Sequence, residues 1–165
     1  MCGIIGIINR SNASELAERG LSSIRYRGLD DSGLYAVKDL CIAHCLHAVG
    51  NSVKQPLIGK GVLVSNCEIY NWGELNKKYK LNARNDSEVL FKLLEKKGTN
   101  KITEILDELD GVYAFAYLIN AKLILARDII GIKPLWYSHT NGFSFASEKK
   151  ALEKIGYLDI IELNP

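Results

Sequence analysis

The chain has 165 residues, of which 47% are apolar and 24% charged, and its formal net charge is +2. This length and balance are ordinary for one globular domain, and they give no electrostatic reason to expect a nucleic acid or a membrane as partner. The four cysteines do not resemble a secreted disulfide framework, and the sequence has neither a signal peptide nor an apolar run long enough to span a bilayer. We therefore expect a cytoplasmic protein.

Apolar periodicity predicts short strands and amphipathic helices in the first half of the chain. In chain order these are a strand at 3–9, a helix at 14–25, a loop at 27–33, strands at 34–38, 40–47 and 61–65, and helices at 72–79 and 87–97. Ser14 is placed to cap the first helix. The loop is predicted because glycine and aspartate are concentrated there.

The second half is predicted to be richer in strands. A helix at 102–109 is followed by strands at 112–119, 123–127, 135–138 and 143–146, a helix at 149–154 and a strand at 159–163. Residues 120–122 are expected to join the first two of these strands as a hairpin. Because strands come in runs with helices grouped between them, we expect an α+β fold of packed antiparallel sheets covered by helices.

A cysteine directly follows the initiator methionine, and removal of Met1 would make Cys2 the first residue. The mature chain would then carry a thiol and a free α-amine on the same residue. An α-amine has a pKa of about 8, so it can take the thiol proton near neutral pH. Nucleophile and base would be supplied together. Taken alone, a cysteine at this position is more often a small buried apolar residue than a nucleophile.

Six short segments of the chain, taken in order, form a recognisable set of motifs. They are 1–4 (MCGI), 25–33 (RYRGLDDSG), 66–71 (NCEIYN), 85–89 (NDSEV), 109–116 (LDGVYAFA), and 126–135 (ARDIIGIKPL) with 145–148 (FASE). In this order they resemble the glutaminase domain of class II glutamine amidotransferases, and most closely the N-terminal half of glutamine-dependent asparagine synthetase. The resemblance covers essentially the whole chain, so residues 1–165 are expected to form one glutaminase-like domain.

The resemblance implies a four-layer α-β-β-α sandwich of two antiparallel sheets, the fold of the N-terminal nucleophile hydrolases. It also implies a reaction in which glutamine and water give glutamate and ammonia, with no cofactor. The Cys2 thiolate would attack the side-chain amide and form a thioester, which water then hydrolyses. The tetrahedral intermediate carries negative charge on oxygen, and this charge needs fixed hydrogen-bond donors.

The resemblance assigns those donors to the side chain of Asn66 and the backbone N–H of Cys67. Without it, Asn66 would be a residue of a turn at the end of a strand. Cys67 stands where the family has glycine. A backbone donor survives that change, but a cysteine at a position that needs a positive φ would be strained.

Three further residues are placed near the substrate by resemblance. Asp86 would pair with the α-ammonium group, although aspartate just before a helical run is also a preferred N-cap. Glu68 would lie near the same ammonium group or on the exposed surface. Arg27 would belong to a loop over the nucleophile, or would pair with Asp30 or Asp31.

One position departs from the family pattern. The family has an arginine that binds the substrate α-carboxylate, and here Leu46 stands in its place. Losing such a partner costs about 2–5 kcal/mol when the other charge is buried. His47 is adjacent but is expected to point to the opposite face of the strand. The backbone N–H groups of Ala48, Val49 and Gly50 remain as substitutes.

The cysteines and histidines between residues 41 and 47 also suggest a metal site. On a strand, however, Cys41, Cys45 and His47 share one face and His44 lies on the other. Four ligands would not converge without a bend, so core packing of the thiols is favoured and no metal is expected.

Three hypotheses follow from these residues. The chain is a glutaminase that passes ammonia to an ATP-dependent synthetase on another chain or in a further domain, because it has neither a Ser-Gly-Gly-x-Asp loop nor a Walker A motif of its own. Alternatively, it is a catalytically impaired binding or regulatory module, or an amidohydrolase for a different γ-glutamyl-type amide. Glutamine or a related amide is the expected ligand, and a homodimer stays open.

Overall fold

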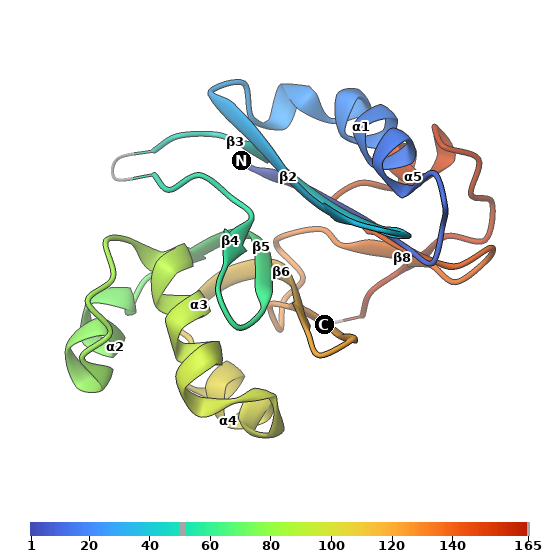
Figure 1. The fold of residues 1–165 in the computed structure, drawn as a ribbon. Coiled ribbons are helices and arrows are strands. Elements are labelled where there is room, and N and C mark those ends of the chain that lie inside the picture. The colour runs from blue at the N-terminus through green and yellow to red at the C-terminus, as the bar shows by residue number, and fades with distance from the viewer. Residues whose placement is uncertain (50–51, 165) are drawn as a thin grey trace.

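The computed structural model describes residues 1–49 and 52–164, and these form two antiparallel sheets that pack face to face. Helices cover the outer side of each sheet, so the molecule has four layers (Figure 1). The predicted α+β sandwich is therefore confirmed. Its layered form follows from the sequence, because strands with one apolar face must bury that face against another sheet or against helices.

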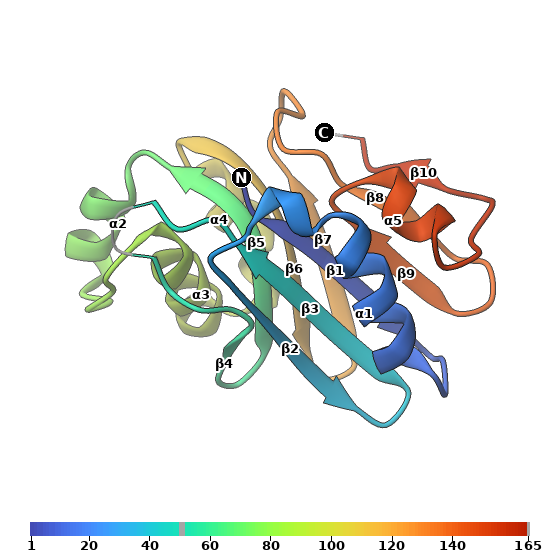
Figure 2. The same cartoon turned by 90° about the horizontal axis from the view of Figure 1, so that it is seen from above.

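The first sheet has six strands and contains the N-terminal strand near its centre. The spatial order is β10 (Ile161–Glu162), β8 (Trp136–Ser138), β9 (Phe143–Ala146), β1 (Gly3–Ile8), β3 (Leu40–Leu46) and β2 (Asp31–Val37). Helices α1 (Ala13–Ser23) and α5 (Lys149–Glu153) cover its outer face, with α1 lying along β1 and β3 (Figure 2). The buried side of α1 presents Leu16, Ala17 and Leu21 to this sheet.

The second sheet has four strands and carries the other half of the core. Its order is β4 (Leu57–Ile58), β5 (Val62–Ile69), β6 (Gly111–Ile119) and β7 (Lys122–Arg127). Helices α2 (Trp72–Tyr79), α3 (Asp86–Lys97) and α4 (Ile102–Asp107) lie on its outer side, and short 3-10 turns occur at Arg25–Arg27 and Thr99–Lys101. Helix α3 buries Val89, Leu90 and Leu93 against the sheet.

The layer between the sheets is built largely from small and branched side chains. It consists of Ile4, Ile42, Val64, Ala114, Ala116, Leu135 and Phe145. Gly6 lies in β1 beneath the ring of Phe145, and a Cβ atom at this position would lie 2.1 Å from Phe145 Cε1. Glycine therefore allows the aromatic ring to pack directly on the backbone of the strand that follows Cys2.

Most helices and strands predicted from the sequence are present, but their first and last residues often differ from the prediction. The 120–122 hairpin is confirmed, and Asn120 and Ala121 both have positive φ, as a tight two-residue turn requires. The capping prediction was wrong, since Asn12 precedes α1 and Ser14 lies inside the helix. The loop predicted at 27–33 was also wrong in its second half, where β2 already pairs with β3.

In the part of the chain that the structure describes, no helix combines the length and apolarity needed to cross a membrane.

Candidate active site

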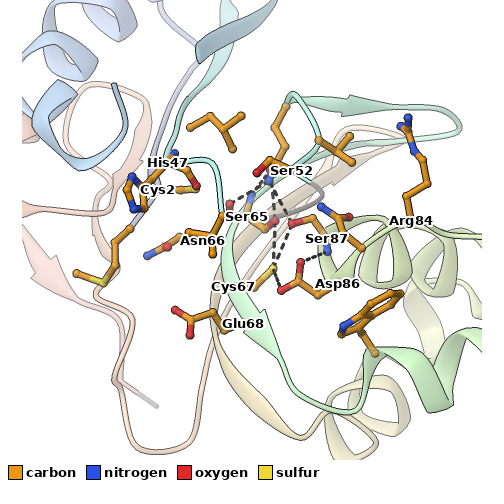
Figure 3. Close-up of a pocket in the computed structure, with 17 residues that line it drawn as sticks. Cys2, His47, Ser52, Ser65, Asn66, Cys67, Glu68, Arg84, Asp86 and Ser87 are labelled. Atoms are coloured by element: carbon orange, nitrogen blue, oxygen red, sulfur yellow. Dashed lines mark hydrogen bonds between the residues drawn. The ribbon is translucent and has the colours of Figure 1, made fainter. Parts of the chain in front are cut away.

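A pocket of about 570 Å³ lies where β1 begins, between the ends of β3 and β5 and the start of α3. Figure 3 shows Cys2 and Asn66 on one side of it and Asp86 on the other. The pocket is lined by Met1, Cys2, Leu46, His47, Val49, Ser52, Val53, Gln55, Ser65, Asn66, Cys67, Glu68, Trp72, Arg84, Asn85, Asp86 and Ser87. Most of the residues placed near the substrate by sequence are thus brought together.

Cys2 stands directly before β1 and is only partly exposed. The backbone N–H of His47 donates to its Sγ over 3.4 Å, and Sγ lies 3.9 Å from the His47 carbonyl oxygen. Burial raises the pKa of the Cys2 thiol, and the His47 N–H opposes this only in part. With Met1 attached, the α-amine of Cys2 is bound in a peptide, so the thiol lacks its predicted base.

Arg27 holds the main chain of Cys2 in place. Its Nε donates to the Cys2 carbonyl oxygen over 2.9 Å, and its Nη1 pairs with Glu148 Oε1 at 2.7 Å. The guanidinium is buried, so this charge-assisted pair orients it firmly. The alternative pairing with Asp30 or Asp31 was wrong, because the carboxylate partner comes from the distant segment before α5.

Asn66 lies on β5 opposite Ala114 of β6 and is 3% exposed. Among the described residues, its side-chain Nδ2 has no hydrogen-bond partner. A buried donor left unpaired costs about 1–3 kcal/mol. The side chain therefore presents an unused N–H donor in the pocket beside Cys2, the kind of group that an oxyanion requires.

Cys67 follows Asn66 in regular β5 geometry and does not have a positive φ, so the strain considered for this position is absent. Its Sγ lies 3.4 Å from Ser87 Oγ and 3.8 Å from Asp86 Oδ2. Burial raises the pKa of the Cys67 thiol to about 12, so it stays protonated and acts as a neutral group of the pocket wall.

Asp86 is the first residue of α3, and the N-cap is Asn85, whose side chain accepts the Glu88 N–H over 2.9 Å. The alternative in which Asp86 caps the helix is therefore wrong. Asp86 Oδ2 accepts the Ile69 N–H over 3.2 Å, which fixes the carboxylate at the pocket. Within residues 1–49 and 52–164, no cationic side chain pairs with it.

Glu68 lines the pocket but already has a cationic partner. Lys133 Nζ donates to Glu68 Oε1 over 2.5 Å, and the lysine side chain is 4% exposed while that of the glutamate is 61% exposed. The buried ammonium would be costly without this carboxylate. The Glu68 carboxylate is thus already paired with Lys133. Both Glu68 and Asp86 line the pocket, but only Asp86 has no cationic partner among the described residues.

The wall that follows β3 offers little to an anion. Leu46 ends β3 and lines the pocket. The Ala48 N–H donates to Asp30 Oδ2 over 2.7 Å, and His47 Nδ1 lies 3.6 Å from the same oxygen. The Ala48 N–H proposed as a substitute for the arginine is therefore occupied. Gly50, the last residue of that proposal, lies outside the described residues.

Sequence reasoning missed the polar floor of the pocket. Gln55 Oε1 accepts the Ser65 N–H over 2.6 Å, and Gln55 Nε2 donates to the Ser65 carbonyl over 3.2 Å and to Ser87 Oγ over 3.4 Å. The glutamine side chain thus substitutes for a neighbouring strand at the edge of β5. Its only local signal is a polar residue before Pro56, which predicts extended backbone and nothing more.

The segment considered for a metal is divided between two layers. Cys41 and Cys45 belong to the core beneath α1, whereas His44 lies on the other face of β3. No cluster of three or more histidine, cysteine or acidic side chains suited to a metal is found over the described residues. His44 is fully buried, and burial lowers its pKa to about 4.

His44 is expected to make the fold sensitive to mild acid. The pKa of histidine is about 6.5 when unfolded and is lower in the fold, so the unfolded chain binds the extra proton and stability falls as the pH drops below about 6.5. The loss between pH 7 and pH 5 is expected to be about 2 kcal/mol. Urea unfolding at both pH values measures it, and His44→Leu should remove most of the difference. An equal loss in that variant would assign the effect to other groups.

Fold and site together define an N-terminal nucleophile amidotransferase. A family model described as glutamine amidotransferase domain matches residues 1–160, and the chain belongs to this family. The chain is 35% identical over 169 residues to asparagine synthetase B [glutamine-hydrolyzing] of Escherichia coli K12, covering 92% of this chain and 30% of that protein. It is 35% identical over 185 residues to putative asparagine synthetase [glutamine-hydrolyzing] 1 of Methanocaldococcus jannaschii, covering 92% and 33%.

The solved structures agree with the sequence comparison. Glutamine phosphoribosylpyrophosphate amidotransferase from B. subtilis, complexed with ADP and GMP, superposes with a TM-score of 0.87 at 25% identity, covering 99% of this chain and 46% of that one. This chain spans about a third of the length of the two asparagine synthetases. The remaining two thirds of those two proteins lie outside the match with residues 1–165.

Proposed function

We propose that the chain, once Met1 is removed, hydrolyses the side-chain amide of glutamine and supplies the ammonia to a synthetase. The observation that carries this proposal is the unpartnered Nδ2 of Asn66 beside Cys2. A buried amide donor without a partner is costly, and an oxyanion formed on the attacked amide would satisfy it. The free carboxylate of Asp86 supports an α-ammonium ligand in the same pocket.

The groups present support each chemical step. The freed α-amine takes the Cys2 thiol proton, and the thiolate attacks the amide carbon. Negative charge gathers on the amide oxygen, where Asn66 Nδ2 and the Cys67 N–H would donate. The C–N bond then breaks, the nitrogen leaves as ammonia with the relayed proton, and a thioester remains. Water hydrolyses the thioester to the γ-carboxylate and restores the thiol.

The acceptor of the ammonia is proposed from the relatives. Both asparagine synthetases are named as glutamine-hydrolysing, and this chain covers only about a third of each. We therefore place the ATP-dependent chemistry in a further domain or on another chain.

The test uses the full chain with Met1 removal verified by intact mass. Incubation with millimolar glutamine is expected to release equal amounts of glutamate and ammonia at a steady rate. Release of neither, by a sample whose mass confirms a free Cys2, would contradict the proposal. In that case a melting temperature that glutamine does not shift would favour a module that kept the fold and lost the reaction, which Leu46 and the occupied Ala48 N–H make the second candidate.

A further inference from the structure

Residues 147 and 148, which lie between β9 and α5, are bound to the start of β1. The Ser147 N–H donates to the Ile4 carbonyl oxygen over 2.9 Å, and Ser147 Oγ accepts the Ile4 N–H over 2.9 Å. Ser147 is fully buried. The serine therefore continues the pairing of β1 with β9 beyond Ala146, and it fixes the main chain two residues after Cys2.

Glu148 reaches the nucleophile itself through Arg27. Its Oε1 accepts from Arg27 Nη1 over 2.7 Å, and Arg27 Nε donates to the Cys2 carbonyl oxygen over 2.9 Å. Arg27 Nη2 lies 4.0 Å from Met1 Sδ, so the same guanidinium contacts both residues at the start of the chain. A carboxylate that is distant in sequence thus orients the group that holds Cys2.

Glu148 is in turn held by two side chains on its outer side. Tyr26 Oη donates to Glu148 Oε1, while Lys150 Nζ lies 3.3 Å from Oε2 and donates to Tyr26 Oη over 2.9 Å. Burial raises the pKa of Glu148, but hydrogen bonds from Tyr26, Arg27 and Lys150 outweigh it and hold the pKa below its usual range. The carboxylate therefore stays charged at neutral pH and remains paired with Arg27.

The position of the Cys2 main chain decides where the reacting groups lie. The attacking sulfur and the freed α-amine belong to the same residue as the carbonyl that Arg27 binds, so a shift of this carbonyl moves both. A misplacement of about 1 Å can lower the rate of an enzyme by about 10²-fold. Arg27 needs its carboxylate partner to stay in place, because a buried charge without a partner is strongly unfavourable.

We propose that Glu148 is a positioning residue for the nucleophile, which holds Arg27 on the Cys2 carbonyl and so sets the direction in which the sulfur and the α-amine face the pocket. The inference rests on the proposed hydrolysis of glutamine by Cys2. Glu148 is not one of the residues that line the described pocket. Its effect therefore falls on the chemical step and not on the binding of glutamine.

The experiment replaces this carboxylate in the mature full chain. Glu148→Gln keeps the shape of the side chain and removes its charge. The kcat for ammonia release from glutamine is expected to fall by about 10- to 100-fold, with KM changed by less than about threefold. A rise of KM at constant kcat would place Glu148 in substrate binding and overturn the inference.

The matched control is Glu162→Gln. Glu162 Oε1 lies 2.8 Å from Arg127 Nη1, and the Arg127 side chain is 8% exposed, against 6% for that of Arg27. Arg127 also donates to main-chain carbonyl oxygens, but these belong to the loop between β7 and β8 and to the residue that follows β10. Each variant thus removes the charge that neutralises a buried arginine, and urea unfolding measures the stability that each loses. The kcat of Glu162→Gln should stay within about threefold of the native value. A comparable fall of kcat in both variants would assign the effect to lost stability and overturn the inference.

A milder variant keeps the test decisive if Glu148→Gln does not fold. Tyr26 is 59% exposed, so Tyr26→Phe removes one hydrogen bond to Glu148 without opening the core. Its kcat is expected to fall by about two- to fivefold at unchanged KM. Native kcat in the Tyr26 and Glu148 variants would overturn this inference and leave the proposed function standing. Absence of hydrolysis by the native mature chain would overturn both.

Discussion

Cys2→Ala is expected to lower ammonia release from the mature chain by roughly 10⁴-fold or more, as for other covalent nucleophiles. The reason is local: Cys2 Sγ lies at the pocket that also holds Asn66 and Asp86 and accepts the His47 N–H. The second thiol of the pocket, Cys67, is kept protonated by burial. Ammonia release under saturating substrate measures the effect. Cys41→Ala, which removes a buried thiol beneath α1, is the control and should retain activity within a few-fold.

The same result is expected for native chain that retains Met1. Its Cys2 nitrogen is an amide, and burial raises the pKa of the Cys2 thiol, so thiolate is scarce at neutral pH. Samples with and without Met1 can be distinguished by intact mass and assayed side by side. Substantial turnover by Cys2→Ala would move the nucleophile to another residue, whereas turnover by the chain that retains Met1 would show that a group other than the Cys2 α-amine acts as the base.

The fold was largely predictable because its signals are local. Val89, Leu90 and Leu93 recur at helical spacing and form the buried face of α3. The continuous apolar run at 112–119 forms most of β6, which places Phe115 and Tyr117 in the core. Errors arose where several residues of one kind compete for a role. Ser14 and Asp86 are both good caps by type, but the chain uses Asn12 and Asn85 at these two positions.

Apart from the residues at and after Leu46, the sequence predicted only those residues of the site that lie within the six ordered segments. The partners that hold the site are distant in sequence and leave no periodic signal. Arg27 finds Glu148 rather than the nearby acidic residues, and the lysine that engages Glu68 is Lys133. Pairing across such separations is decided by how the layers pack, which no local pattern specifies.

These distant pairs also explain why the Asp86 carboxylate has no cationic partner in the pocket, where Asn66 Nδ2 and Ser52 Oγ are also unpaired among the described residues. Arg27 and Lys133 are buried and each is neutralised by its own carboxylate, so neither is available to a ligand. Asp86 and Asn66 keep their polar groups directed at the pocket without a charge partner or an acceptor among the described residues. Unpaired polar groups in a folded chain cost stability, so their joint presence in one pocket points to a ligand that satisfies both.

Asn66→Ala should separate catalysis from folding. Loss of one oxyanion donor is expected to lower kcat by about 10²–10³-fold with little change in KM, because the donor acts on charge that exists only in the transition state. The free energy of unfolding should change less than in a normal core deletion. Nδ2 is buried without a partner, so removing it relieves a cost that offsets the small cavity, and the free energy of unfolding should stay within about 1 kcal/mol of the native value. Steady-state kinetics and urea unfolding of the same preparation measure both quantities. A large loss of stability with kcat unchanged would instead make Asn66 a structural residue of β5.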